Sequence, residues 1–123
     1  MEKIVPWAKK KKMIVIEDCA QTCGGDYKGK KLGTWGDFGC FSFYVTKNLA
    51  TGEGGMILTK SNKAAERIKK LSLHGMNNNA WKRYSGKGYN HYKVEEAGFK
   101  FNMTDIQASL GIHQLKRLNK NWK

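Results

Sequence analysis

The sequence predicts an α/β domain, and three patterns support this class. A short continuous apolar run, "MIVI" at residues 13–16, is typical of a strand that is covered on both faces. Two later segments place apolar residues at helical spacing. The expected order of elements is helix, strand, strand, strand, helix, long loop and helix, which indicates α/β without fixing the order of the strands.

The length of the chain allows one modest domain. It has 123 residues, of which 40% are hydrophobic, and it contains one proline. A core is possible at this size, but two ordinary domains are not. No internal repeat or low-complexity tract is visible.

The first helix and the first strand adjoin each other. Ile4, Val5 and Ala8 have helical spacing, and the segment ends in lysines, as the C-terminus of a helix prefers. The strand at 13–16 follows and leads into Glu17 and Asp18. Acidic side chains at the end of a buried strand lie where open α/β sheets commonly place their functional sites.

The middle of the chain predicts a glycine-rich loop at 22–37 and two further strands. The stretch "DFGCFSFYV" at 37–45 is expected to form one of them, with successive side chains pointing to opposite faces. One face would carry Cys40, Ser42 and Tyr44, and the other Phe41, Phe43 and Val45. The stretch "GGMILT" is expected to form the third strand.

Two helices and a long loop complete the chain. Ser61 is a plausible N-cap for a helix that carries Ala64, Ala65, Ile68 and Leu71 and stops near Gly75. Residues 76–97 have no sustained period, and a long loop of this kind is usually functional or mobile. The last helix, with apolar positions at Ala108, Ile112 and Leu115, is expected to start at Asn102 or Thr104.

The net charge of +13 raises the question of a polyanionic partner. The chain carries 23 Lys and Arg residues against 10 Asp and Glu residues. These basic residues are scattered over different elements, which favours a lysine-rich surface over a nucleic-acid-binding stripe. A basic nucleic-acid-binding module therefore stays as the third and least favoured hypothesis.

Metal, disulfide and membrane functions find no support in the sequence. Cys19, Cys23 and Cys40 are odd in number and lack paired C-x-x-C spacing, so buried free thiols are expected. The spacing of the three histidines makes no metal motif, and we assign none of them to catalysis. The apolar stretch near the N-terminus is too short for a signal peptide or a membrane span, and a cytoplasmic protein is expected.

Four features together predict a pyridoxal phosphate (PLP) site. Asp18 ends a strand, Ser42 lies on a strand face, Lys47 follows five residues later, and "TGEGG" supplies flexible backbone. PLP requires an amine, a carboxylate for its ring nitrogen, and hydroxyl or backbone donors for its phosphate. Each residue alone has a simpler interpretation: a turn-forming aspartate, a serine in a tight sheet position, and a solvated lysine.

Three motifs resemble one known family. These are "VIEDCAQ", "YKGKKLGTWGDFGCFSFYVTKNLATGEGGMI" and "GFKFNMTDIQASLGIHQLKRL". Together they resemble the DegT-type sugar-nucleotide aminotransferases, PLP enzymes of the aspartate-aminotransferase fold, known as fold type I. The resemblance implies part of a large domain with a mostly parallel sheet flanked by helices. Residues 1–123 would be its central portion, without the preceding segment and the following small domain of full-length relatives.

The resemblance also assigns roles to individual residues. Lys47 would form the internal aldimine and move the proton, Asp18 would pair with the pyridine nitrogen, and Ser42 would bind the phosphate. Gln21 would lie against the ring near its 3-hydroxyl. Asn102 is a further cofactor-binding candidate, serving a neighbouring subunit, although many relatives have Asn and Arg where "GFKFN" has Lys and Asn.

The implied reaction is transamination. Relatives that remove a sugar hydroxyl carry histidine at the position of Lys47, so lysine here favours amino transfer over dehydration. The amino group would pass from an amino acid, usually glutamate, to a nucleotide-linked keto sugar, expected to be a 4-keto sugar. The basic side chains of Lys82, Arg83 and Lys87 suit a diphosphate partner, and a homodimer is expected. The alternative is a non-catalytic fragment of such an enzyme with a structural or interaction role.

Overall fold

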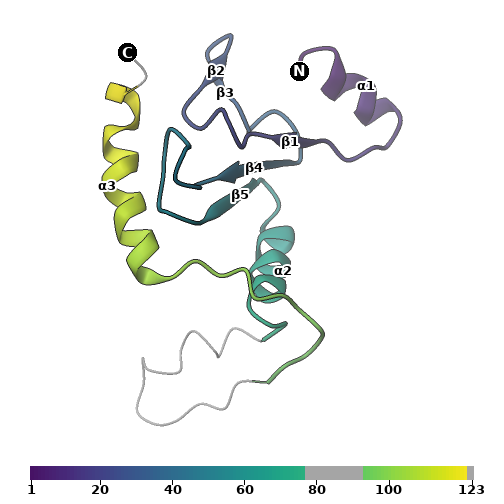
Figure 1. Ribbon diagram of the computed structural model, residues 1–123. Coiled ribbons are helices and arrows are strands. Elements are labelled where there is room, and N and C mark those ends of the chain that lie inside the picture. Colours follow the sequence, from purple (N-terminus) through teal and green to yellow (C-terminus); the bar gives the residue numbers. More distant parts are fainter. Residues whose placement is uncertain (77–92, 122–123) are drawn as a thin grey trace. The chain divides into compact units, whose positions relative to one another are not determined.

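The computed structural model describes residues 1–76 and 93–121, and the chain divides into two compact units (Figure 1). The first unit comprises Met1–Lys60 and Met103–Lys123, and the second comprises Ser61–Asn102.

The first unit begins with helix α1, Ile4–Lys10, which confirms the predicted opening helix. Ala8 is its buried residue, and Lys9 and Lys10 occupy its last turn, where positive charge favours the negative end of the helix dipole. The chain leaves the helix through Lys12, whose φ of 55° is left-handed. The Met13 N–H then donates to the Ala8 carbonyl at 2.9 Å, a closure typical of helix C-termini.

Three strands form the sheet of this unit in the order β1-β4-β5. Strand β1, Ile16–Asp18, runs parallel to β4, Phe38–Ser42, and β4 pairs in antiparallel fashion with β5, Gly55–Thr59. The central strand therefore contributes hydrogen bonds on both sides. Within the described residues the sheet is mixed, with one parallel pair and one antiparallel pair.

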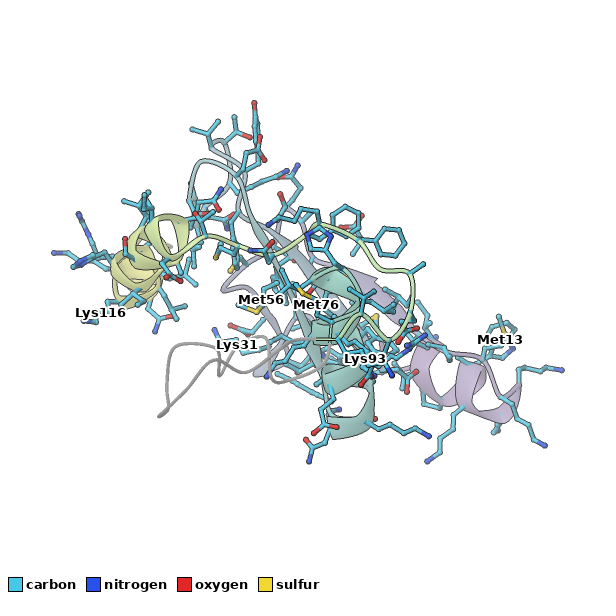
Figure 2. All side chains as sticks on the ribbon, turned by 90° about the horizontal axis from the view of Figure 1, so that it is seen from below. Met13, Lys31, Met56, Met76, Lys93 and Lys116 are labelled. Carbon is cyan, nitrogen blue, oxygen red and sulfur yellow. The ribbon has the colours of Figure 1, made fainter. Side chains whose placement is uncertain are left out.

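The first strand lies later in the chain than the apolar run that predicted it. Residues 13–15 precede the ladder, and β1 consists of Ile16, Glu17 and Asp18. The ladder begins at Ile16 because its partner Phe38 is the first residue of β4. Met13, labelled in Figure 2, is exposed, and Ile16 is 65% exposed, so the expected cover on both faces is not present within this unit.

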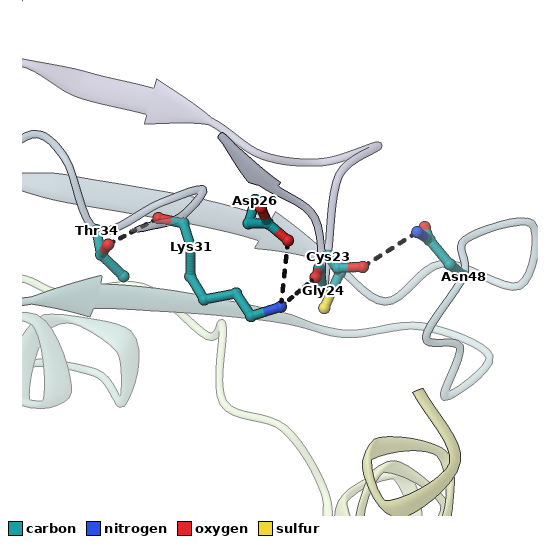
Figure 3. Close-up of polar contacts among 6 residues, drawn as sticks. All are labelled: Cys23, Gly24, Asp26, Lys31, Thr34 and Asn48. Carbon is teal, nitrogen blue, oxygen red and sulfur yellow. Dashed lines mark hydrogen bonds and ion pairs between the residues drawn. The ribbon is translucent and has the colours of Figure 1, made fainter. Parts of the chain in front are cut away.

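A small hairpin interrupts the stretch 22–37, where the sequence predicted a loop without strands. Strands β2, Asp26–Tyr27, and β3, Lys30–Lys31, pair in antiparallel fashion around Lys28 and Gly29. Both turn residues have positive φ, 51° and 75°, as a two-residue hairpin turn prefers. Lys31 Nζ donates to the Gly24 carbonyl at 2.8 Å and lies 4.0 Å from Asp26, which connects the hairpin to its base (Figure 3).

Helix α3, Asp105–Asn121, begins with a capping box and supplies part of the core of this unit. The Gln107 N–H donates to Thr104 Oγ1, and the Thr104 N–H donates to Gln107 Oε1 at 2.9 Å. Of the two predicted start positions, Thr104 is therefore the one that caps the helix. The buried core consists of Phe43, Leu49 and Leu118.

The inward face of α3 differs from the apolar face that the sequence predicted. Leu118 is 6% exposed, whereas Leu115 is 62% exposed and Ile112 is also exposed. Figure 2 shows the labelled Lys116 extending outward from α3. The helical period was correct, but apolar residues lie on more than one side of this helix, so the period alone did not select the buried side.

The second unit contains helix α2, Asn62–Ser72, and an extended segment at residues 93–102. Ser61 caps the helix as predicted, because its Oγ accepts the Ala64 N–H at 3.2 Å. The segment pairs with the helix end: the Phe99 N–H donates to the Leu71 carbonyl at 2.7 Å, and the His74 N–H donates to the Phe99 carbonyl at 2.8 Å.

Two ion pairs join α2 to the same extended segment. Lys70 bonds Glu95 at 2.5 Å, and Arg67 bonds Glu96. The hydrogen bond and charge of Lys70 lower the pKa of Glu95 below its ordinary value. The predicted helix end near Gly75 is confirmed, and this glycine has a left-handed φ of 71°. A side chain there would lie 1.9 Å from the Glu96 carbonyl oxygen.

We expect Leu118→Ala to lower the free energy of unfolding of the chain by about 2–4 kcal/mol, because it empties a buried site. Leu115→Ala is the matched control in the same helix and should change it by less than about 0.5 kcal/mol. Urea titration followed by circular dichroism measures both. Equal losses for the two variants would contradict the core assignment.

Candidate cofactor-binding site

The parallel pairing of β1 with β4 places two predicted site residues on one face of the sheet. Asp18 is opposite Cys40 in the register, and Ser42 lies two residues further along β4. Side chains on paired residues point to the same face, as do those of residues i and i+2 in a strand. Strand geometry then places the Asp18 and Ser42 Cα atoms roughly 8 Å apart.

Asp18 is exposed and keeps capacity to accept another hydrogen bond. One carboxylate oxygen, Oδ1, accepts the Ala20 N–H at 3.0 Å, which orients the side chain at the end of β1. The other oxygen, Oδ2, accepts no hydrogen bond from the residues that the structure describes. A protonated ring nitrogen is the kind of donor that this oxygen can accept.

Ser42 is half-buried at the last position of β4. Its Oγ accepts the Tyr44 N–H over a long distance of 3.4 Å. A hydroxyl that accepts one hydrogen bond still has its own proton to donate. Ser42 can therefore donate to an anionic oxygen such as that of a phosphate.

Lys47 lies in the turn between β4 and β5 and is half-buried. Its backbone N–H donates to the Tyr44 carbonyl at 2.9 Å. Its amine makes no hydrogen bond or ion pair with any residue in the described ranges 1–76 and 93–121. An amine with no carboxylate partner is available for carbonyl chemistry.

The residues beside Lys47 anchor this turn to the rest of the unit. Asn48 Nδ2 donates to the Cys23 carbonyl at 3.1 Å (Figure 3). Leu49 is buried in the core, and the Thr51 N–H donates to the Phe43 carbonyl at 2.8 Å. Lys47 is thus presented by a turn held at both ends, which limits the conformational freedom of its backbone.

Of the glycines after Lys47, Gly54 is required by contacts within the chain. Gly54 has a φ of 152°, and a side chain there would lie 2.5 Å from Met103 Cε and 2.7 Å from Thr51 Oγ1. Gly52 also has a positive φ, 83°, but faces open space. Close approach of a cofactor to this turn stays a prediction.

Two further predicted residues belong neither to β1 or β4 nor to the turn that presents Lys47. Gln21 is exposed in the turn after β1, three residues beyond Asp18. Asn102 belongs to the second unit, and its side-chain oxygen accepts a hydrogen bond from Lys100 Nζ. The basic residues Lys82, Arg83 and Lys87 lie outside the described residues.

Glu17 is a buried carboxylate directly before Asp18 in β1, and the sequence indicated it only as an acidic residue at a strand end. It is 8% exposed and accepts the backbone N–H groups of Gly33, Trp35 and Gly36 at 2.9, 2.7 and 2.8 Å. The available signal was a second acidic residue on a predicted buried strand, followed by a glycine-rich loop. Because charged residues are rarely buried without partners, this pattern indicates a carboxylate bound to backbone N–H groups.

The predicted free thiols are confirmed, and two of them have raised pKa values. Cys19 is buried, whereas Cys23 and Cys40 are half-buried. Burial raises the pKa of the Cys19 thiol, and the nearby Glu17 and Asp18 charges add to the rise. Burial also raises the pKa of Cys23, with a further contribution from Cys19. Both thiols are therefore poor nucleophiles at neutral pH.

The donor set at this end of the sheet fits pyridoxal phosphate. Asp18 supplies a carboxylate oxygen and Lys47 an amine that have no partner among the residues of ranges 1–76 and 93–121, and Ser42 supplies a hydroxyl. These are the three kinds of group that the cofactor needs. Within the described parts of the chain, no group of three His, Cys, Asp or Glu side chains has the geometry to hold a metal ion. None of the described helices is long and apolar enough to span a membrane.

Comparison with known proteins matches the chain to a family of aminotransferases. The model of the DegT/DnrJ/EryC1/StrS aminotransferase family matches residues 1–123. The spore coat polysaccharide biosynthesis protein SpsC of Bacillus subtilis is 50% identical over 119 residues, which are 97% of this chain and 31% of that protein. The GDP-perosamine synthase of Escherichia coli O157:H7 is 38% identical over 120 residues, 95% of this chain and 29% of the relative.

Solved structures give the same result. An aminotransferase from Psychrobacter cryohalolentis superimposes with a TM-score of 0.83 and 36% identity over 97% of this chain and 30% of its own. The PLP form of Spr1654 from Streptococcus pneumoniae has a TM-score of 0.73 and 35% identity over 93% of this chain and 28% of its own. The predicted α/β fold of the PLP-dependent transferases is confirmed. The chain spans about 30% of the length of these relatives.

We expect Cys19 to react with iodoacetamide more slowly than Cys23 or Cys40 at pH 8. It is 3% exposed, and its raised pKa lowers the fraction of reactive thiolate at this pH. Mass spectrometry of peptides from a time course measures the three rates, and the chain in urea is the control in which they should become similar. A Cys19 rate in the folded chain equal to its rate in urea would contradict its burial.

Proposed function

The chain belongs to the DegT/DnrJ/EryC1/StrS aminotransferase family, and from this premise we propose that it forms the central part of the PLP-binding large domain of a sugar aminotransferase. Aminotransferases of this family depend on PLP. The alignment of Asp18 and Ser42 on one face of the sheet, followed by the turn that presents Lys47, is the observation that carries this proposal.

Asp18, Ser42 and Gln21 would bind the cofactor without forming a covalent bond to it. Asp18 would hold the ring nitrogen of the cofactor in its protonated form through its free carboxylate oxygen. Ser42 would donate a hydrogen bond to the phosphate, and Gln21 would contact the ring. When bound, the cofactor supplies an electron-withdrawing ring that makes the proton on the substrate's reacting carbon more acidic.

Lys47 would carry out two tasks with one amine. Its Nζ atom would hold the cofactor covalently, and it would then accept the proton from the reacting carbon of the substrate and return it. Both tasks require the unprotonated amine, whereas a carboxylate partner would stabilise the protonated form. The absence of an ion pair to Lys47 among the described residues supports this assignment.

The proposed substrates are an amino acid donor, glutamate, and a nucleotide-linked 4-keto sugar. The names of two relatives, both GDP-perosamine synthases, support an amino sugar carried on a nucleoside diphosphate. The name of SpsC supports a place in polysaccharide synthesis. We also propose a cytoplasmic homodimer in which Asn102 contributes to the site of the neighbouring subunit.

The exposed apolar residues of the chain support its proposed place inside a larger domain. Ile16, Ile57 and Ile112 are all exposed, although they lie on regular elements. Apolar side chains on ordered strands and helices are usually covered in a complete domain. The experiments below therefore use the full-length enzyme that contains this chain, or a chimera in which residues 1–123 replace the matching part of a relative.

We expect Lys47→Ala to abolish the visible absorption band that pyridoxal phosphate develops when it is held covalently by a lysine amine. Activity with glutamate and a nucleotide-linked keto sugar should be lost as well. Lys63→Ala, which removes an exposed lysine of α2, is the matched control and should keep both. Borohydride reduction followed by peptide mapping identifies the modified lysine, and modification spread evenly over the lysines would refute the assignment.

We expect Asp18→Asn to weaken cofactor binding by about 10- to 100-fold, because a hydrogen bond to a charged group contributes about 1.5–3 kcal/mol. Fluorescence titration of the cofactor measures the change in affinity. Asp26→Asn, on the exposed hairpin strand β2, is the matched control and should bind normally. Normal affinity in Asp18→Asn would contradict the proposed role of this residue.

A further inference from the structure

Glu17 lies directly before Asp18, but its side chain is buried whereas that of Asp18 is exposed. The two residues are consecutive in β1, so their side chains point to opposite faces of the sheet. Asp18 is exposed on the face that also carries Ser42, whereas the Glu17 carboxylate is buried against the loop that leads into β4. The two adjacent carboxylates therefore differ in both burial and hydrogen bonding.

The hydrogen bonds of Glu17 use both of its oxygens. Oε1 accepts the N–H groups of Trp35 and Gly36, and Oε2 accepts the N–H group of Gly33. A buried carboxylate is strongly disfavoured unless hydrogen bonds compensate for its lost hydration. The three backbone donors provide this compensation, and the carboxylate in turn satisfies donors that would be costly to leave unpaired.

The loop that Glu17 binds is in close contact with the sheet. A side chain on Gly36 would lie 2.6 Å from the Val15 carbonyl oxygen, and one on Gly39 would lie 2.3 Å from the Gly33 carbonyl oxygen. The loop is also bonded to the start of β1, because Asp37 Oδ2 accepts the Val15 N–H at 2.8 Å. The loop therefore packs closely against the residue before β1 and against β4.

Strand β1 depends on these contacts because its own ladder is short. It has three residues, and within the described part of the chain it pairs only with β4. A three-residue pairing fixes the strand weakly by itself. The bonds from Glu17 to the loop hold β1 on the face opposite Asp18, and that loop continues directly into β4 through Asp37.

We propose that Glu17 is a positioning residue that acts through Asp18, a role that rests on the proposed function of Asp18. By bonding β1 to the loop before β4, the Glu17 carboxylate sets the distance between the Asp18 carboxylate and the Ser42 and Lys47 groups that follow from β4. Displacements of about 1 Å at a reacting group reduce activity by about 100-fold, so this distance matters for the reaction.

The test compares Glu17→Gln with Glu66→Gln, a matched change at an exposed glutamate of α2. Glutamine keeps one acceptor oxygen but places an NH₂ group against one of the backbone N–H donors. In the full-length enzyme, at a temperature at which both variants are fully folded, we expect Glu17→Gln to bind pyridoxal phosphate about 10- to 100-fold more weakly. The pH midpoint of the bound cofactor's absorption should also shift, whereas Glu66→Gln should match the parent in both measurements.

A double-mutant cycle separates positioning from a purely structural role. If Glu17 acts through Asp18, Glu17→Gln should cause little further loss of cofactor affinity when Asp18→Asn is already present. If the two losses multiply, Glu17 does not act through Asp18 and the inference is overturned. A lower melting temperature for Glu17→Gln with unchanged affinity and unchanged absorption would overturn it as well.

A second variant keeps the test decisive if Glu17→Gln does not fold. Asp37→Ala removes the bond from the same loop to the Val15 N–H and leaves Glu17 in place. Like Glu17→Gln, Asp37→Ala should weaken cofactor binding, and it should have little further effect when Asp18→Asn is already present. An unchanged cofactor affinity in Asp37→Ala would overturn the inference.

The single variants distinguish failure of the two proposals. If Asp18→Asn alone binds the cofactor normally, the proposed role of Asp18 fails. If Asp18→Asn binds weakly and Glu17→Gln binds normally, only the positioning role of Glu17 fails.

Discussion

The parallel pairing of β1 with β4 is the constraint on which the candidate site depends. In a parallel pair the carboxyl ends of both strands meet at one edge, so groups at the two ends come together although 24 residues separate Asp18 from Ser42. The register of Asp18 opposite Cys40 then decides which face they share. A shift of one residue would move Asp18 to the covered face and leave Glu17, with its three hydrogen bonds, in solvent.

The consecutive residues Glu17 and Asp18 place a buried, hydrogen-bonded carboxylate next to the one that we propose binds the cofactor. The buried carboxylate binds backbone N–H groups, whereas the exposed one has an acceptor oxygen that no described residue uses. The Glu17 oxygens are occupied by backbone N–H groups inside the protein, whereas the exposed Asp18 oxygen is accessible to a donor from outside it. The alternation of side chains along a strand lets neighbouring residues have these two environments.

The turn after β4 fixes the backbone that carries the Lys47 side chain. A long lysine side chain has high conformational entropy, so its amine is placed best when the backbone is fixed. Asn48 and Leu49 provide this through a hydrogen bond to the Cys23 carbonyl and burial in the core. Gly54 then returns the chain to β5 with a backbone conformation and a close contact to Met103 that other residues would strain.

The sequence by itself determined the kinds and order of the main helices and strands, because periodicity and caps are local signals, and its motifs pointed to Asp18, Ser42 and Lys47 as candidate site residues. Only the tertiary structure decided the start of β1, the buried side of α3 and the burial of Glu17. Each of these depends on a partner distant in sequence: Phe38 opposite Ile16, the core around Leu118, and the N–H groups of the loop at 33–36. Hydrogen bonding and burial are pairwise properties, and a local pattern carries only one member of each pair.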